Sequence, residues 1–307
     1  MSESSWKQYY EDNPPPSDLP KIKAQLIEFC SHHASNNTRV VLVTSGGTTV
    51  PLEHNTVRFV DNFSAGTRGS SSAEYFLKAG CAVIFLHRSK SLEPFVRHVP
   101  VSDLMESLVT EQAVDGNWSI TVHGDLCNKL AEISNEYKRL CAKKMLIKIP
   151  FTTLSSYFHI LYEASHALKP MGRNAILYLA AAVSDFYIPR QEMATHKISS
   201  DEELSLNLRM VPKLLQPLVR YWVPDAFVVS FKLETDESIL ISKARKALER
   251  YQHKLVIGNE LNSRKYKVTL VTKTEEKSII LNQEEISEGK EIEEKIVEEL
   301  FKYYEKL

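Results

Sequence analysis

The stretch from Val40 to Gly80 restricts the possible folds of this chain more than any other segment. It begins with the β-branched run Val40–Val43, which predicts a buried strand. Two glycine loops follow, Ser45-Gly46-Gly47-Thr48 and Phe63-Ser64-Ala65-Gly66-Thr67-Arg68-Gly69, and the second leads into a predicted helix over 70–78. Glycine lets the backbone approach a phosphate group closely, and the first N–H groups of a helix are free to bind it. The pattern predicts an anion site, with simple tight turns as the alternative.

The spacing of these glycines disfavours two common nucleotide motifs. The dinucleotide motif G-x-G-x-x-G needs its glycines within one short turn, whereas about twenty residues separate Gly47 from Gly66. The Walker sequence G-K-[ST] does not occur in the chain. A nicotinamide-dependent oxidoreductase is therefore a weaker interpretation. The remaining interpretation is a phosphate site with a long polar segment between its two glycine loops, and chemistry could take place in that segment.

Composition indicates a globular protein without a membrane or nucleic-acid partner. Of the 307 residues, 43% are apolar and 25% are charged, and the formal net charge is −1. A near-neutral charge offers no attraction for nucleic acid or anionic lipid. The longest apolar run, Ala175–Val183, is too short to span a bilayer. The N-terminus lacks the apolar core of a signal peptide, and the four scattered cysteines predict reduced thiols, so we expect a cytoplasmic protein.

Apolar runs and helical periods predict a three-layer α/β/α sandwich. Strands are predicted at 82–86, 175–186, 226–231 and 255–257, and helices at 21–33, 154–168, 238–251 and 292–304. Strand–helix–strand units make parallel neighbours, so we expect a Rossmann-like, mostly parallel sheet with a C-terminal hairpin at 268–272 and 278–281. Residues 1–20, which include Pro14-Pro15-Pro16, are expected to form a flexible or surface-wrapped arm, and residues 21–307 a single nucleotide-binding catalytic domain.

Two further segments are less regular. Within 90–150 the sequence predicts a strand at 120–123, a helix at 126–145 and a strand at 146–151. Apolar residues alternate strictly over Leu204–Met210, which is typical of a half-exposed strand. This alternation suits a flap or dimerisation arm, with an ordinary edge hairpin as the alternative.

Polar side chains follow the predicted strands at their carboxyl ends, where open parallel sheets bind ligands. Asp185 ends one strand, and either Lys197 or Lys232 could offset the charge of a phosphate. Asn62 and Asn259 carry amide groups that could stabilise an oxyanion. The chain offers neither a Ser-His-Asp order nor a histidine pair at metal-binding spacing. Taken alone, these residues indicate a nucleotide-using α/β enzyme.

Several longer strings resemble a known family. They are Thr44-Ser45-Gly46-Gly47-Thr48, Pro51-Leu52-Glu53, Val57-Arg58-Phe59, Asp61-Asn62-Phe63-Ser64-Ala65-Gly66, Arg68-Gly69, Ala180–Tyr187, His196-Lys197-Ile198 and Ser230–Asp236. Together they resemble the signature of phosphopantothenate–cysteine ligase, in the eukaryotic stand-alone form that has no fused decarboxylase domain. The resemblance covers residues 38–90 and 150–306, and it leaves the N-terminal arm and the segment 90–150 without a recognised motif.

The resemblance implies an acyl-activation reaction in coenzyme A biosynthesis. The carboxylate of 4′-phosphopantothenate would attack the α-phosphate of ATP or CTP, which releases pyrophosphate and forms an acyl-nucleotidylate, with Mg²⁺ on the triphosphate. The amine of L-cysteine would then displace the nucleoside monophosphate. The family is dimeric, with a substrate-contacting asparagine supplied across the interface, so we expect a homodimer. A non-catalytic nucleotide-binding scaffold with the same fold is the alternative function.

The resemblance also implies roles for single residues. Gly46, Ser64, Gly66, Gly69, Phe231 and Asn259 match nucleotide-binding positions, and Asn62, Ala181, Ala182 and Asp185 match positions that contact phosphopantothenate. Asn62 would stabilise the acyl-transfer oxyanion, and Lys197, which matches the first lysine of the bacterial K-x-K-K flap motif, would lie against the α-phosphate or the acyl oxygen. No protein metal ligand is implied. Ser199-Ser200 stand where the bacterial motif has two more lysines. Because the bacterial form prefers CTP, this departure and the eukaryotic resemblance favour ATP.

Overall fold

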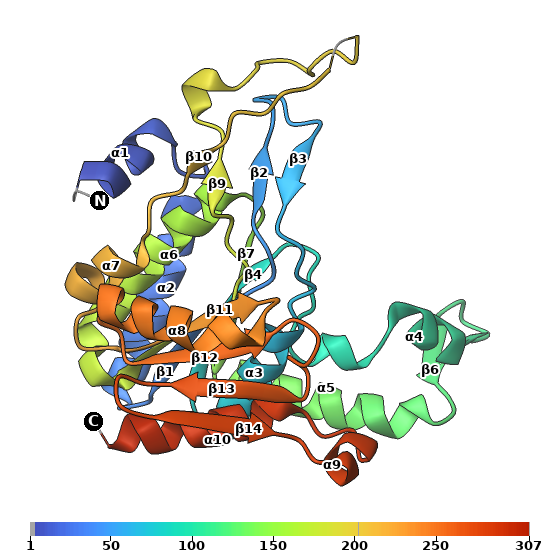
Figure 1. Cartoon of the computed structure of the whole chain (residues 1–307). Helices are drawn as coiled ribbons and strands as arrows, with labels where there is room; N and C mark the ends of the chain where they lie inside the picture. The colour runs from blue at the N-terminus through green and yellow to red at the C-terminus, as the bar shows by residue number, and fades with distance from the viewer. Residues whose placement is uncertain (1–3, 202, 307) are drawn as a thin grey trace.

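The computed structural model of the chain describes residues 4–201 and 203–306, and its centre is one eight-stranded sheet (Figure 1). The strand order is β14-β13-β12-β11-β8-β1-β4-β7. In chain order the strands are β1 Val40–Ser45, β4 Ala82–Arg88, β7 Leu146–Phe151, β8 Ala175–Leu179, β11 Phe227–Glu234, β12 Leu255–Glu260, β13 Lys267–Val271 and β14 Glu276–Ile280. Neighbours from β7 to β12 are parallel, and β13 and β14 add an antiparallel hairpin. The predicted mostly parallel sheet with a C-terminal hairpin is confirmed.

Helices cover both faces of the sheet because the central strands are apolar on both sides. Leu42 and Leu177 belong to the core on one face, Val43 and Tyr178 to the core on the other, and all four are fully buried. The first face carries α2 (Leu19–Ser35), α6 (Leu154–Leu168) and α8 (Glu237–Tyr251). The second carries α3 (Thr67–Lys78), α5 (Leu126–Ala142) and α10 (Ile292–Glu305). The predicted three-layer sandwich is therefore confirmed.

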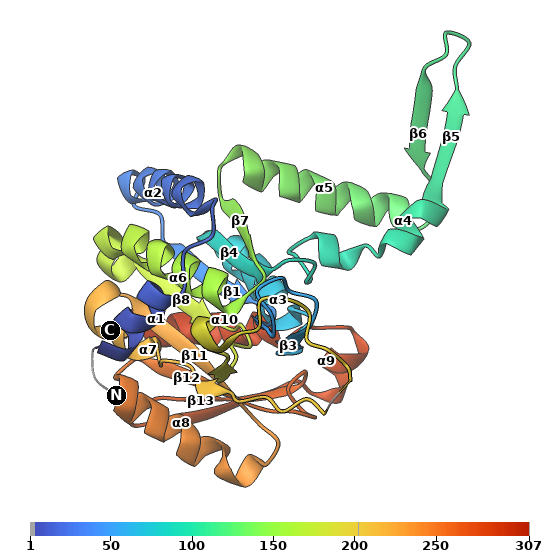
Figure 2. The same cartoon turned by 90° about the horizontal axis from the view of Figure 1, so that it is seen from above.

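The remaining elements lie outside these layers. The hairpin of β2 (Thr49–Pro51) and β3 (Phe59–Asp61) projects beyond the carboxyl end of the sheet, and β9 (Phe186–Tyr187) pairs with β10 (Arg209–Met210) beside it. Figure 2 shows a second hairpin, β5 (Leu108–Gln112) with β6 (Trp118–Val122), which stands away from the body next to α4 (Val101–Ser107). The shorter elements are α7 Leu215–Pro217, a π-helical turn Leu218–Trp222, α9 Gln283–Ser287 and 3₁₀ turns at Val96–His98, Lys169–Asn174 and Arg190–Glu192.

Several predicted bounds need correction. The strand expected over 175–186 ends at Leu179, because the backbone after it bonds to the loop that follows β1. The strand expected at 120–123 is β6, and its partner β5 was not predicted. The helix expected over 126–145 ends at Ala142. Of the alternating stretch Leu204–Met210, only the last two residues form a strand.

The N-terminal arm is folded onto the body of the protein. Helix α1 (Ser4–Asp12) buries Tyr9, whose ring lies 5.2 Å from that of Phe158 and 5.1 Å from that of Tyr187, centroid to centroid. The prolines at 14–16 do interrupt the helix, as the sequence predicts. Residues 4–12 therefore fit the surface-wrapped alternative for this arm, and not the flexible one.

Two observations bear on where and how the chain can act. In the described part of the chain, no helix combines the length and the apolar character needed to cross a membrane. The four cysteines are free thiols, two of them buried and two exposed. Burial raises the pKa of the Cys30 thiol to about 12, so this cysteine stays protonated and unreactive.

Candidate functional site

The two glycine loops meet at the carboxyl end of β1. Gly46 and Gly66 both have left-handed backbone, with φ of +81° and +85°. The hydroxyl of Ser45 donates a hydrogen bond to the carbonyl of Gly66 at 3.1 Å, and the hydroxyl of Ser64 accepts the Gly66 N–H at 3.4 Å. A methyl group on Gly69 would lie 2.4 Å from the Cβ of Ser45, so this position requires glycine. The close contact places the first turn of α3 directly beside the end of β1.

The first glycine loop is also joined to the loop that follows β8. The N–H of Ala182 donates to the carbonyl of Gly46 at 2.8 Å, and the N–H of Thr48 donates to the carbonyl of Ala182 at 3.1 Å. The N–H of Ala181 donates to the hydroxyl of Thr44 at 3.1 Å. The loop predicted to bind phosphate and the loop predicted to bind phosphopantothenate are therefore neighbours.

Asn62 lies at the base of the β2–β3 hairpin, against the first glycine loop. Its N–H donates to the carbonyl of Thr48 at 3.1 Å. Its carbonyl oxygen would be only 1.6 Å from a methyl group on Gly47, so glycine is needed there to let the two segments touch. Asp185 is more exposed and forms an ion pair with Lys213. Asn62 is thus held firmly at the junction of the loops, with Asp185 at their outer edge.

Phe231 and Asn259 lie on the side of the site that faces α3. The ring of Phe231 packs on Tyr178, with centroids 4.9 Å apart and planes at 76°. Asn259 is buried, and its side-chain oxygen accepts a hydrogen bond from Arg68 at 3.4 Å. Arg68 also forms a 2.7 Å ion pair with Glu293, whose pKa is raised by burial and lowered in part by the Arg68 charge. Sequence reasoning gave Arg68 no role, because its partners stand far along the chain.

A second arginine was also missed. Arg88, the last residue of β4, donates to the carbonyl of Gly47 at 3.0 Å and to the carboxylate of Asp61 at 2.6 Å. It therefore ties the first glycine loop to the end of β3. The position of Arg88 at the carboxyl end of a strand is the sequence signal that could have found it.

The backbone on both sides of Lys197 is bonded to the tip of the β2–β3 hairpin. Its neighbour Ile198 donates its N–H to buried Glu53 at 3.4 Å, near the tip of the β2–β3 hairpin. Asn62 is at the base of this hairpin, and the four residue-to-residue steps of extended chain from Arg58 to Asn62 span about 13 Å. The other candidate cation, Lys232, pairs with Glu234 at 3.2 Å. Within one chain, the glycine loops and Asn62 come together, whereas the backbone around Lys197 is attached to the opposite end of the hairpin.

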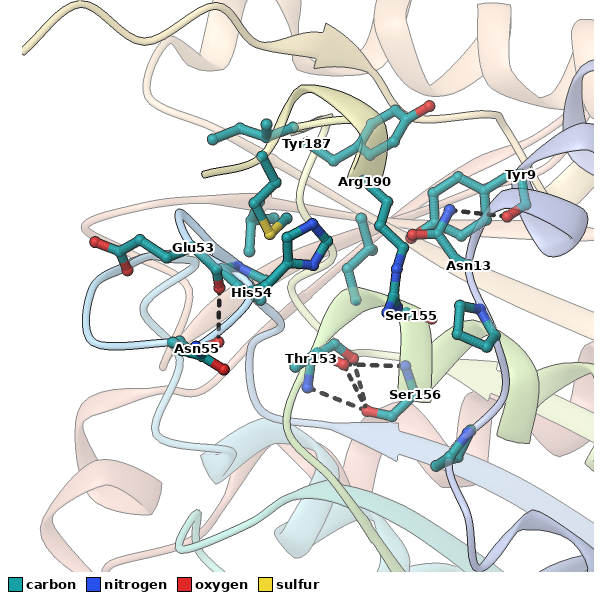
Figure 3. Close-up of a pocket in the computed structure, with 18 residues that line it drawn as sticks. Tyr9, Asn13, Glu53, His54, Asn55, Thr153, Ser155, Ser156, Tyr187 and Arg190 are labelled. Carbon is teal, nitrogen blue, oxygen red and sulfur yellow. Dashed lines mark hydrogen bonds between the residues drawn. The ribbon is translucent and has the colours of Figure 1, made fainter. Parts of the chain in front are cut away.

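A cavity of about 430 Å³ lies on another side of the hairpin (Figure 3). Tyr9 and Asn13 of the N-terminal arm, His54 of the hairpin tip and the first turn of α6 line it, and Arg190 reaches toward Ser155. The described residues that line it include none of the predicted site residues. The cavity is therefore separate from the predicted site.

Comparison with known proteins identifies the family. Residues 36–121 and 161–303 match the model of the DNA/pantothenate metabolism flavoprotein C-terminal domain. Over 289 residues the chain is 47% identical to the human phosphopantothenate–cysteine ligase, and this aligned region covers 94% of this chain and 93% of the human protein. The chain belongs to the phosphopantothenate–cysteine ligase family. The predicted family and enzyme class are confirmed.

Other members of the ligase family extend the match to nearly the whole chain. The phosphopantothenate–cysteine ligase CAB2 of Saccharomyces cerevisiae is 40% identical over 98% of this chain and 86% of the yeast protein. A solved structure of a Cab2 mutant in complex with phosphopantothenate-cysteine has a TM-score of 0.87 and 38% identity, and covers 98% of this chain and 97% of that one. The family fold therefore includes the segment 90–150, for which sequence motifs suggested nothing.

Proposed function

We propose that this chain joins 4′-phosphopantothenate to L-cysteine through an acyl-adenylate, with ATP as the co-substrate. The 2.8 Å hydrogen bond from the N–H of Ala182 to the carbonyl of Gly46 carries the proposal. It joins the loop matched to phosphopantothenate with the loop matched to the nucleotide phosphates. A carboxylate held by one loop would lie beside an α-phosphate held by the other, and such positioning is a large part of the catalysis of group transfer.

The site residues divide the work of the two steps. In the first step a carboxylate oxygen attacks the α-phosphorus and pyrophosphate leaves, while the free N–H groups at the start of α3 bind phosphate oxygens. In the second step the cysteine amine attacks the acyl carbon, loses a proton and displaces AMP. The side-chain amide of Asn62 would donate to the oxyanion that forms on the acyl carbon. Phe231 and Asn259 would hold the base and ribose.

Mg²⁺ would arrive with the nucleotide. The described residues contain no group of three His, Cys, Asp or Glu side chains that could hold a metal ion. Mg²⁺ with a nucleotide is bound mostly by substrate phosphates and water, with one or two carboxylates. The bound cation would screen the charge of the departing pyrophosphate.

We favour ATP over CTP, and we infer a homodimer in which the hairpin tip reaches the partner's site. The flap, defined here as residues 194–201, lacks two lysines of the bacterial motif. Phe59, Phe63 and Met210 on the hairpin and its neighbours are 51%, 91% and 67% exposed, which is unusual for large apolar side chains and suits an interface. Lys197, far from Asn62 in its own chain, would then act across that interface.

Pyrophosphate release tests the proposed function. Purified protein is mixed with phosphopantothenate, Mg²⁺ and either ATP or CTP, with and without cysteine. We expect ATP-dependent release, with cysteine required for sustained turnover and with AMP as the second product. A protein that binds ATP but releases no pyrophosphate with either nucleotide would favour the non-catalytic scaffold instead. The intact connection of both loops at Gly46 argues against that alternative.

A further inference from the structure

The carboxylate of Glu53 lies where the β2–β3 hairpin and the flap meet. Its side chain is fully buried, although it stands on a hairpin that projects from the body of the protein. Burying a charge is costly unless hydrogen bonds and opposite charge satisfy it. The N–H of Arg58 is the main cause that holds the pKa of Glu53 below its usual range, so the group is ionised at neutral pH.

Each oxygen of this carboxylate has its own donors. Oε2 accepts the N–H groups of Val57 at 3.2 Å and Arg58 at 2.9 Å, which shapes the hairpin tip. Oε1 accepts the Arg58 guanidinium at 3.3 Å and the N–H of Ile198 at 3.4 Å. Oε2 therefore bonds to the hairpin alone, whereas Oε1 bonds to both the hairpin and the flap.

Further hydrogen bonds run between the same two segments. The N–H of His54 donates to the carbonyl of Ala194 at 2.8 Å, and the N–H of Asn55 donates to the carbonyl of Thr195 at 3.1 Å. The Arg58 guanidinium also donates to the carbonyl of Ile198 at 2.9 Å. Lys197 directly precedes Ile198, whose N–H and carbonyl are bonded to Glu53 and Arg58.

We propose that Glu53 is a positioning residue, which fixes the flap on the hairpin tip so that Lys197 and Arg58 are presented as one unit. This inference rests on the proposed function, because the position of Lys197 matters for turnover only if the flap serves the ligase site. All the contacts of Glu53 described above are with protein groups, so it acts through the residues that it holds. Because Lys197 would lie against the reacting α-phosphate or acyl oxygen, the loss of its position should lower turnover rather than weaken nucleotide binding.

The variant Glu53→Gln separates the two oxygens. The amide oxygen of glutamine can still accept the N–H groups of Val57 and Arg58, but its NH₂ group then faces the Arg58 guanidinium and the Ile198 N–H, which are donors as well. The flap should be released while the hairpin turn survives. Because hydrogen bonds to a charged group are lost, we expect trypsin to cleave after Lys197 roughly tenfold faster, measured by mass spectrometry of the fragment 1–197. We also expect kcat to fall roughly tenfold with KM for ATP unchanged.

Asp201→Asn is the matched control. Asp201 is a flap carboxylate that accepts the hydroxyl of Ser199 at 2.6 Å within the flap itself, so its variant should match the wild type in both measurements. Equal cleavage rates for the wild type and Glu53→Gln would contradict the claim that Glu53 holds the flap on the hairpin. Faster cleavage with an unchanged kcat would overturn the positioning role.

The folding of the variant and the activity of the wild type are checked separately. If circular dichroism shows that Glu53→Gln is unfolded, Glu53→Asp takes its place, because it keeps the charge but is one methylene too short to reach both segments. It should change cleavage and kcat in the same directions. If the wild type has no ligase activity, the proposed function fails, and the cleavage measurement still decides whether Glu53 holds the flap.

Discussion

Asn62 is anchored by its main chain, independently of its side chain. The N–H that donates to Thr48 and the carbonyl that packs on Gly47 both belong to the backbone. The side-chain amide is therefore free to serve the reaction, and its removal should leave the junction of the loops in place. This separation makes the proposed oxyanion role testable by substitution.

We expect Asn62→Ala to lower kcat for phosphopantothenoylcysteine formation roughly 100-fold, because a donor to the oxyanion is lost. The melting temperature should stay close to that of the wild type. Asn128→Ala, at an exposed position of α5, is the control and should keep full activity. Unchanged turnover of Asn62→Ala in a steady-state assay would remove Asn62 from the mechanism.

The β2–β3 hairpin is joined to the sheet at a point where the chain has no space for an additional side chain. Gly47 leaves no space for a side chain, since a methyl group would meet the carbonyl oxygen of Asn62 at 1.6 Å. Arg88 joins the first glycine loop to the end of β3 through its hydrogen bonds to Gly47 and Asp61. A shift at this point would move Asn62 and the hairpin tip together.

Gly47→Ala should therefore displace the hairpin. We expect a loss of about 3 kcal/mol in the free energy of unfolding through overpacking, and a loss of most ligase activity. Gly80→Ala is the control, because Gly80 has a φ of +80° but no atom within 4 Å of the added methyl group. It should cost about 1 kcal/mol of backbone strain and leave activity intact. Urea denaturation measures the free energy of unfolding, and a parallel assay measures ligase activity. A fully active Gly47→Ala variant would contradict the predicted displacement of the hairpin.

The sequence predicted the sheet well because its strands are runs of apolar residues buried on both faces, as in Val40–Val43. It overextended β8 because Ala180-Ala181-Ala182 are as apolar as a strand, although their backbone bonds to the glycine loop. The strand β5 was missed because most of its residues are exposed and only Leu108 and Val109 are apolar, so it lacks the apolar run of a buried strand. Helix α1 was missed because the prolines that follow it suggested an irregular arm.

The candidate site was predictable where function follows from local sequence. The glycine loops, Asn62 and the alanines after β8 were found in this way, and the structure brings them together. Arg68 could not be found, because its ion pair with Glu293 joins residues far apart in the chain. The distance of Lys197 from Asn62 could not be foreseen either, since nothing in the sequence says that the β2–β3 hairpin stands away from the sheet.

At the scale of the whole molecule, the position of Lys197 makes assembly part of the mechanism. If Lys197 acts on the partner's site, the variants Lys197→Ala and Asn62→Ala should each be nearly inactive alone. An equal mixture, refolded or co-expressed, should recover about a quarter of wild-type activity, because half of the dimers are mixed and each has one complete site. No recovery in a mixture shown to exchange subunits would place Lys197 in its own chain's site.

Isotope transfer tests the acyl-adenylate most directly. Phosphopantothenate labelled with ¹⁸O in its carboxylate is incubated with the protein, ATP, Mg²⁺ and cysteine, and the phosphate-containing products are analysed by mass spectrometry. The acyl-adenylate mechanism predicts one ¹⁸O atom in AMP, because the attacking carboxylate oxygen leaves with the α-phosphate, and none in pyrophosphate. Label in orthophosphate together with ADP, or no label in AMP, would contradict it.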